Sequence, residues 1–239
     1  MNILVTGGSK GLGAAIVKRL AANKANHVSF TFSASEDAAR KLSDEFDNVD
    51  AIHCNFSNQK SVDDLVVKLS SMNLNVLINN AYLPFVKEHF HKANPDRYLK
   101  SFELNVLPVL RITQAAITEF RKAKFGKIIN ILSTAVIGNP PVGWSEYAAN
   151  KNYILSMSKS WATENIRFNI SSNCVSPGFM KTDFTNDTDE RIIEQIIASH
   201  PLKKLTEPEE VAETVLFLSQ CSQQINGINL VMNAGENIL

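Results

Sequence analysis

Tyr147 and Lys151 offer the clearest chemistry in this sequence, because they stand four residues apart in a segment of helical period. That interval places the two side chains on one face of a helix, about one turn apart. A free tyrosine, with a pKa of about 10, is a poor proton shuttle at neutral pH. A lysine cation beside the phenol favours the phenolate, so we expect Lys151 to lower the pKa of Tyr147 toward the working range. The pair therefore predicts acid–base catalysis with Tyr147 as the group that moves the proton.

Ser133 is the hydroxyl best placed to assist that proton transfer. It follows the apolar run 127–132 and precedes Tyr147 by fourteen residues, with a loop rich in Gly and Pro between them. A buried strand that ends in a hydroxyl presents it at the edge of a sheet. There it is able to hydrogen-bond the oxygen that receives the proton and to stabilise charge as it develops.

Asn105 is a further catalytic candidate, in the helical segment before that strand. Pro108 follows three residues later and is unable to donate a hydrogen bond to the carbonyl of Leu104. We therefore expect a kink that leaves backbone groups for water or for Lys151, with Asn105 anchoring a proton relay. The alternative is a polar residue that caps a local distortion.

A glycine-rich turn near the start of the chain predicts a nucleotide site. The segment Thr6-Gly7-Gly8-Ser9-Lys10-Gly11-Leu12-Gly13 joins an apolar run to the beginning of a helix. Glycines there let backbone N–H groups approach a pyrophosphate, and the helix N-terminus favours its negative charge. The expected contacts are Gly7, Ser9, Lys10, Gly11, Leu12 and Gly13. A glycine turn without a ligand is the alternative.

Charge at the end of the second expected strand favours NADPH over NADH. An NAD site needs a carboxylate there for the ribose 2′-hydroxyl, and a carboxylate repels the 2′-phosphate of NADP. The sequence has no acid before Glu36, while Ser33 offers a hydroxyl and Lys10 a cation to a phosphate. Lys10 as an ordinary solvated loop residue is the alternative.

These motifs together resemble the short-chain dehydrogenase/reductase family, and most closely its 3-oxoacyl-acyl-carrier-protein reductases. The spacing Thr-Gly-x-x-x-Gly-x-Gly, the strand-end serine and Tyr-x-x-x-Lys carry the likeness, with Ser-Pro-Gly-Phe-Met-Lys-Thr-Asp from Ser176. The resemblance implies hydride transfer between a nicotinamide cofactor and a carbonyl carbon, with Asn105, Ser133, Tyr147 and Lys151 as the catalytic residues. It also implies a homotetramer.

The resemblance adds cofactor contacts elsewhere in the chain. Tyr147 and Lys151 are expected to meet the nicotinamide half as well as the substrate. The further contacts that it implies are Asn55, Phe56, Asn79, Ala81, Pro177, Gly178 and Thr182. Two positions depart from the family pattern: Asn55 replaces an aspartate, and Tyr82 replaces the glycine of Asn-Asn-Ala-Gly. The second change puts the local backbone path in doubt and suggests that Tyr82 lines the substrate pocket.

The elements that must position these residues alternate between short β-branched runs and longer helical segments. This pattern predicts a single α/β domain over 1–239, a doubly wound Rossmann-type fold with a seven-stranded parallel sheet flanked by helices. The expected strands are 3–6, 27–32, 51–54, 76–78, 127–132, 170–175 and 228–231. The expected helices are 11–22, 35–46, 58–71, 96–122, 145–165, 188–199 and 207–219.

The irregular stretch 184–206 is expected to be a lid over the substrate, since ligands of such sheets bind outside the carboxyl ends of the strands. A surface insertion is the alternative.

Composition limits the partners that the chain would take. Twenty-four basic residues balance twenty-four acidic ones, so no net field favours nucleic acid or an anionic membrane. We expect no membrane span and no metal. Three dispersed cysteines and the absence of a signal segment in 1–5 indicate a cytoplasmic protein.

The sequence is compatible with two substrate classes, a small-molecule ketone and a carrier-bound ketone. A carrier protein would need a basic patch near the cleft, and the candidates are Arg121, Lys122, Lys124, Lys127 and Arg167. A reductase or epimerase of a sugar-derived or secondary-metabolite ketone is the alternative function. A nucleotide sensor without turnover is a third, less compatible with Ser133, Tyr147 and Lys151.

Overall fold

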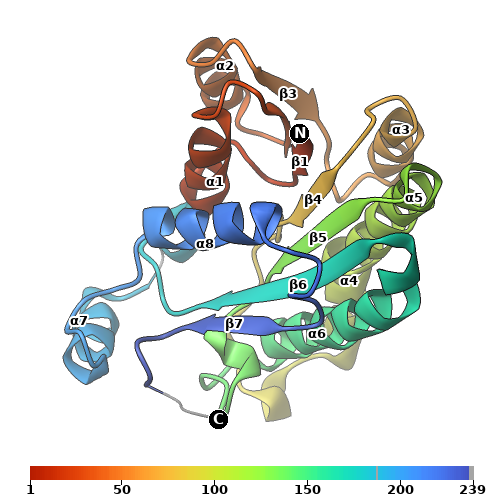
Figure 1. Ribbon diagram of the computed structural model, residues 1–239. Helices are drawn as coiled ribbons and strands as arrows, with labels where there is room; N and C mark the ends of the chain where they lie inside the picture. The colour runs from red at the N-terminus through yellow and green to blue at the C-terminus, as the bar shows by residue number, and fades with distance from the viewer. Residues whose placement is uncertain (187, 237–239) are drawn as a thin grey trace.

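The computed structural model describes residues 1–186 and 188–236 (Figure 1). Seven parallel strands form one sheet in the order β3-β2-β1-β4-β5-β6-β7, so the winding reverses between β1 and β4. The strands are β1 Asn2–Val5, β2 His27–Phe32, β3 Val49–His53, β4 Val76–Asn79, β5 Gly126–Ile131, β6 Ile170–Pro177 and β7 Asn229–Met232. The predicted single α/β domain with a seven-stranded parallel sheet is confirmed.

Burial on both faces explains why these segments form strands. All residues of β4, β5 and β6 are buried, as expected for a parallel sheet covered on each side. Successive side chains alternate between two cores, so that Leu4 and Leu77 face one core while Ile3, Val5 and Ile78 face the other.

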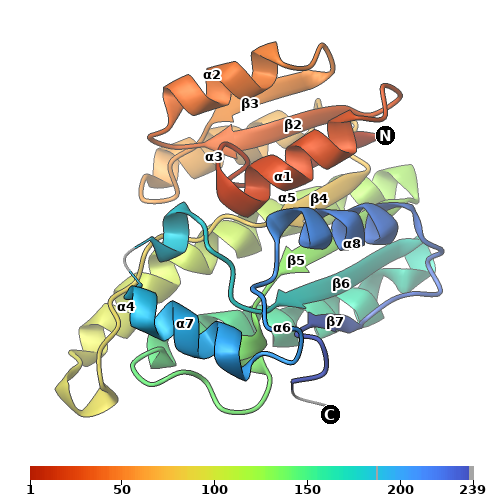
Figure 2. The ribbon, with the colours of Figure 1, turned by 90° about the vertical axis from the view of Figure 1, so that its left-hand side faces the viewer.

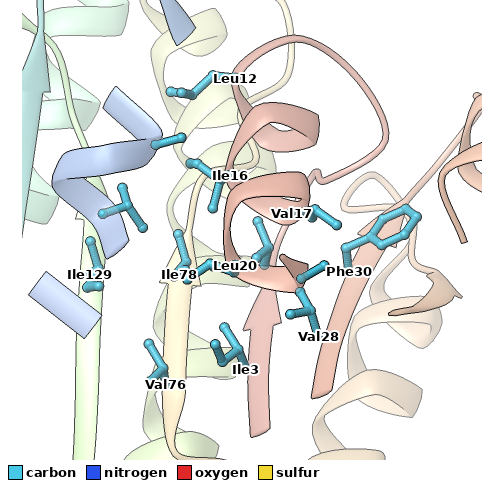
Figure 3. Packing of buried hydrophobic residues seen from close by; sticks show 14 of the residues in the cluster. Ile3, Leu12, Ile16, Val17, Leu20, Val28, Phe30, Val76, Ile78 and Ile129 are labelled. Carbon is cyan, nitrogen blue, oxygen red and sulfur yellow. The ribbon is translucent and has the colours of Figure 1, made fainter. Parts of the chain in front are cut away.

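Eight α-helices occur within the described residues, and six of them cover the two faces of the sheet. The eight helices are α1 Gly11–Ala21, α2 Glu36–Asp44, α3 Gln59–Leu69, α4 Pro95–Asn105, α5 Leu107–Ala123, α6 Ser145–Asn165, α7 Glu190–Ser199 and α8 Pro208–Gln220. The helices α1, α2 and α8 pack on one face, and α3, α5 and α6 pack on the other (Figures 1 and 2). Figure 3 shows the first of these cores, where Ile16 and Leu20 of α1 meet strand residues such as Ile78.

The helix expected over 96–122 is two helices, because the chain breaks at Val106. Asn105 ends α4 and Leu107 begins α5, with Val106 at φ −105° and ψ −50° between them. Pro108 lies in the first turn of α5, where its missing N–H costs no intrahelical bond. The predicted distortion is therefore present, two residues before the proline.

The segment expected as a lid contains α7, which lies apart from the two helix layers (Figures 1 and 2). Position 187 of that segment lies outside the described residues. Across the described chain, none of the helices has the length and apolar character that a bilayer crossing requires. The same residues contain no cluster of three or more His, Cys, Asp or Glu side chains able to hold a metal.

Candidate active site

A cavity of about 300 Å³ opens at the carboxyl edge of the sheet, where the winding reverses between β1 and β4. Its walls come from the segments that follow six of the strands, as the doubly wound topology requires. The predicted site residues that line it are Gly7, Lys10, Gly11, Leu12, Gly13, Ser33, Phe56, Ala81, Tyr147, Lys151 and Thr182. The structure thus brings the glycine turn and the tyrosine–lysine pair to one cavity.

The glycine turn has the form of a cradle for a phosphate group. Gly7 and Gly11 adopt φ +67° and +50°, a region that side chains disfavour. A Cβ on Gly13 would overlap the Gly7 carbonyl oxygen, so α1 is able to approach the turn closely only with glycine at this position. The turn is anchored by Asn80, whose Nδ2 donates to the Gly7 oxygen at 2.9 Å. These features fit the pyrophosphate of a dinucleotide at the N-terminus of α1.

The end of the cavity beside β2 carries no carboxylate among its described lining residues. Ser33 and Lys10 both line the cavity and are both exposed, while Glu36 lies off it as the first residue of α2. A hydroxyl and a cation bind a 2′-phosphate better than they bind a 2′-hydroxyl, because the phosphate is negatively charged.

Tyr147 and Lys151 occupy the first two turns of α6, and each side chain is only 7% exposed. Lys151 Nζ donates to the carbonyl of Ile131, the last residue of β5, at 2.7 Å. Ser133 lies two residues further on and does not line the cavity; its Oγ accepts from the Ala135 N–H at 3.1 Å, and its side chain is near enough to Tyr147 to lower the pKa of that phenol. The three side chains therefore meet at the carboxyl end of β5.

The expected lowering of the Tyr147 pKa by Lys151 is wrong for this structure. Burial raises the pKa of Tyr147 to about 12, and the hydrogen bond from Ser133 offsets only part of that rise. Burial also lowers the pKa of Lys151 to about 7. Desolvation dominates because both groups lie against the sheet, where a charge loses its hydration. The phenol is thus protonated at neutral pH, and the ammonium is close to its titration point.

Asn105 does not contact Lys151 directly. Its Oδ1 accepts from the backbone N–H of Leu83 at 2.6 Å, and its Nδ2 donates to Ser101 Oγ at 3.5 Å. The hydrogen bond of Lys151 goes to β5, so the expectation that the helix break leaves groups for water or Lys151 stays a prediction. Asn105 and Lys151 nevertheless line one small internal cavity of about 10 Å³, close to the size that one water molecule requires.

Five of the predicted cofactor residues do not line the main cavity. They are Ser9, Asn55, Asn79, Pro177 and Gly178. Asn55 closes a local turn by accepting from the Ser57 N–H at 2.9 Å, and Asn79 is buried with its Nδ2 donating to Asn130 Oδ1 at 2.8 Å. In place of Asn79, its neighbour Asn80 reaches the cavity. The cofactor roles of these five stay predictions.

Sequence reasoning missed much of the apolar wall. The additional lining residues are Thr31, Phe32, Cys54, Asn80, Leu83, Ile131, Leu132, Met180 and Phe184, besides Tyr82, for which a place at the pocket was suggested. Most of them are next to a predicted motif in the sequence, and that position could have identified them as lining residues.

Aromatic rings surround Tyr147. Tyr82 and Phe85 each lie 4.9 Å from its ring, Trp144 lies 5.4 Å away and Phe184 lies 6.2 Å away. Phe85 stacks on the Tyr147 ring with an interplanar angle of 22°. Phe184 belongs to the expected lid segment, so this segment contributes directly to the surroundings of the phenol.

The basic residues suggested for docking a carrier protein lie at the wrong edge of the sheet. Lys127 is the second residue of β5, at the end opposite Ser133. Its side chain is 3% exposed and donates to the Cys221 carbonyl at 2.6 Å. Arg121 and Arg167 both pack on the Phe168 ring. Lys127 lies near the start of β5, and β5 runs from that edge of the sheet toward the cavity. The five basic residues therefore do not flank the cleft.

Comparisons with known proteins agree with the fold and identify the family. The family model described as short chain dehydrogenase matches residues 1–192. The chain is 32% identical to 3-oxoacyl-[acyl-carrier-protein] reductase FabG of Rickettsia prowazekii, over 97% of this chain and 95% of that protein. It is 31% identical to 3-oxoacyl-[acyl-carrier-protein] reductase MabA of Mycobacterium tuberculosis, over 98% of this chain and 92% of that one.

Two solved structures are similar in fold. An actinorhodin polyketide ketoreductase variant, crystallised with NADPH, superposes with a TM-score of 0.87 at 24% identity, covering 99% of this chain and 97% of its own. A short chain dehydrogenase/reductase family protein superposes with a TM-score of 0.86 at 26% identity, covering 98% and 96%.

Proposed function

This chain belongs to the short-chain dehydrogenase family of NAD(P)-dependent oxidoreductases, and we propose that it is an NADPH-dependent reductase that converts a ketone to a secondary alcohol. The observation that carries the proposal is that Tyr147 and Lys151 line a cavity that the glycine turn also lines, with the Ser133 side chain beside Tyr147. A protonated phenol at that position is the group that a carbonyl reduction requires.

The residues that would hold the cofactor divide between its two halves. The glycine turn, from Gly7 to Gly13, would bind the pyrophosphate, with Lys10 and Ser33 meeting the 2′-phosphate. Lys151 and Thr182 would meet the nicotinamide half. When bound, NADPH supplies the hydride that the carbonyl carbon accepts.

Tyr147 supplies the proton in this proposal. Its hydroxyl donates to the carbonyl oxygen as that oxygen gains negative charge, and Ser133 hydrogen-bonds the same oxygen. The raised pKa of Tyr147, about 12, keeps the donor protonated before the reaction. After transfer, the phenolate is stabilised by the Lys151 ammonium and regains its proton through Lys151, with Asn105 and a water in the small cavity as the relay.

Two substrate classes follow from different observations. The names of the FabG and MabA relatives favour a 3-oxoacyl thioester carried by a protein. The aromatic rings of Tyr82, Phe85 and Phe184 beside Tyr147 favour a flat cyclic ketone such as a secondary metabolite, because a planar apolar substrate stacks on such rings.

The lid and the oligomer belong to the same proposal. Residues 184–206 would close over the substrate, supported by Phe184, which already lines the cavity. A homotetramer is proposed from the family resemblance alone.

The test is a panel of ketones, including a 3-oxoacyl thioester and an aromatic cyclic ketone, assayed with NADPH and with NADH for the parent and Tyr147→Phe. We expect NADPH oxidation with at least one ketone and a loss of about 100-fold or more in kcat for Tyr147→Phe, with NADPH affinity retained. Substrate conversion without net change in NADPH absorbance would identify an epimerase instead. If Tyr147→Phe turned over as fast as the parent, Tyr147 would not be the proton donor.

A further inference from the structure

Tyr82 makes three contacts that tie it to the proton-transfer residues. Its ring lies 4.8 Å from Lys151 Nζ, with the ammonium over the ring, and 4.9 Å from the Tyr147 ring at an interplanar angle of 74°. Its hydroxyl accepts from Asn150 Nδ2 at 3.1 Å. Asn150 precedes Lys151 in α6, so Tyr82 is attached to the same turn of helix through both its ring and its hydroxyl.

We propose that Tyr82 is a positioning residue whose ring stabilises the Lys151 ammonium beside Tyr147 and whose hydroxyl, bound by Asn150, fixes the ring in place. The proposal rests on the proposed function, because it assigns Tyr82 a part in the same proton transfer. In this role Tyr82 acts through Lys151.

The surroundings of Lys151 explain why an aromatic face matters there. The described titratable groups that face it are Cys174 from β6, Tyr147 from its own helix and Tyr82 from the segment after β4. The Glu146 carboxylate acts on Tyr82 and is paired with Arg97 at 2.9 Å. Burial raises the pKa of Cys174 to about 11, and it also raises the pKa of both tyrosines, so all three groups are neutral at pH 7.

With neutral neighbours, the ammonium depends on dipoles rather than on a carboxylate. One dipole is the Ile131 carbonyl, which accepts from Lys151 at 2.7 Å. The other is the negative π face of Tyr82, since a cation over an aromatic ring is stabilised most where water is excluded. The Tyr147 ring also faces the ammonium, at the longer distance of 5.6 Å.

The hydroxyl of Tyr82 is held from two helices. Asn150 Nδ2 donates both to this hydroxyl and, at 2.9 Å, to Ser101 Oγ in α4. Ser101 in turn accepts from Asn105 Nδ2 at 3.5 Å. The polar chain therefore links Tyr82 to the break between α4 and α5 and holds the ring against Lys151.

The experiment measures the ionisation of Lys151 directly. The full-length protein, labelled with ¹³C at the lysine ε carbons, is titrated by NMR, and the Lys151 signal is assigned by its loss in Lys151→Arg. Tyr82→Leu removes the ring but keeps an apolar side chain, and Tyr82→Phe keeps the ring and removes the hydroxyl. Tyr153→Leu is the matched control, because Tyr153 lies on the same helix, is 40% exposed and packs on Phe102.

We expect Tyr82→Leu to lower the pKa of Lys151 by about 0.5 to 1, from the free energy of a desolvated cation–π contact. Tyr82→Phe keeps the ring but loses the hydrogen bond that fixes it, so its Lys151 pKa should fall between the parent and Tyr82→Leu, whereas Tyr153→Leu should leave that pKa within about 0.3 of the parent value. Should Tyr82→Leu fail to fold by circular dichroism, Tyr82→Met supplies the same comparison. An unchanged or raised pKa in the folded Leu or Met variant would overturn the proposal.

A second readout separates this proposal from the proposed function. If a ketone is turned over, the high-pH limb of its kcat/KM profile should move to lower pH in Tyr82→Leu by the same amount as the NMR titration. A moved pKa with an unmoved limb would overturn the positioning role. If no ketone is turned over, the proposed function fails, while the NMR titration still decides whether Tyr82 stabilises the ammonium.

Discussion

Replacing Lys151 by methionine should make the protein more stable at neutral pH while abolishing turnover. The ammonium is buried against β5 with one carbonyl partner, and burial lowers its pKa from 10.5 to about 7. At pH 7 and below, desolvation of the Lys151 ammonium therefore destabilises the folded parent. The destabilisation is on the order of 1.36 kcal/mol for each unit by which the folded pKa lies below the unfolded one. Methionine has a similar shape and no charge to desolvate.

The sign of the pH dependence follows from the two pKa values of Lys151. Between pH 7 and 10.5 the unfolded chain holds a proton that the folded chain has released, so the free energy of unfolding of the parent rises with pH. Below pH 7 both states are protonated, and this contribution is flat. The stability advantage of Lys151→Met should accordingly shrink by about 2 to 3 kcal/mol between pH 7 and pH 9.

Urea unfolding of parent and Lys151→Met at pH 6, 7, 8 and 9, at constant ionic strength, measures that difference. Lys159→Met is the matched control, because Lys159 is on the same helix and is exposed. Its stability difference from the parent should stay constant with pH. If the difference between Lys151→Met and the parent were also constant across this range, burial would not be what sets the ionisation of Lys151.

Three further changes test other parts of the site. Gly13→Ala places a Cβ on the Gly7 carbonyl oxygen, so it should weaken NADPH binding at least about 10-fold in a fluorescence titration, and unchanged binding would contradict the close approach of α1. Ser33→Asp puts a carboxylate on the cavity wall and should lower the NADPH to NADH ratio of kcat/KM about 10-fold or more, whereas Ser35→Asp, off the cavity, should leave it near the parent value. Arg97→Ala leaves the Glu146 carboxylate, which is 4% exposed, without its 2.9 Å partner, and should cost about 2 kcal/mol in urea unfolding, against about 0.5 kcal/mol or less for Lys122→Ala in the exposed pair with Glu119.

The fold was predictable because its signals are local. Most strands are short apolar runs bounded by turn residues, and most helices repeat their apolar positions at helical period, so the parallel sheet follows from their alternation. The same holds for part of the site. Residues that follow strands of one parallel sheet must meet at its carboxyl edge, which is why the glycine turn, Tyr147 and Thr182 were found together on one cavity.

Tertiary structure alone decided the electrostatics of the site. The interval between Tyr147 and Lys151 reports their distance along a helix, but it does not report how deeply α6 packs against β5. That depth is what raises one pKa and lowers the other. The bond from Lys151 to the Ile131 carbonyl likewise joins two residues twenty positions apart in the chain and in different elements.

Contacts between distant segments are a second feature that local sequence patterns do not predict. The segment after β4 folds back so that Tyr82 reaches α6 and Asn105 receives the Leu83 N–H. The basic residues near 121–127 were assigned to the wrong edge of the sheet because charge spacing carries no strand direction. Spacing along the chain determines which side chains share an element, whereas burial and partners depend on how the elements pack, and in this protein packing sets the ionisation of the catalytic pair.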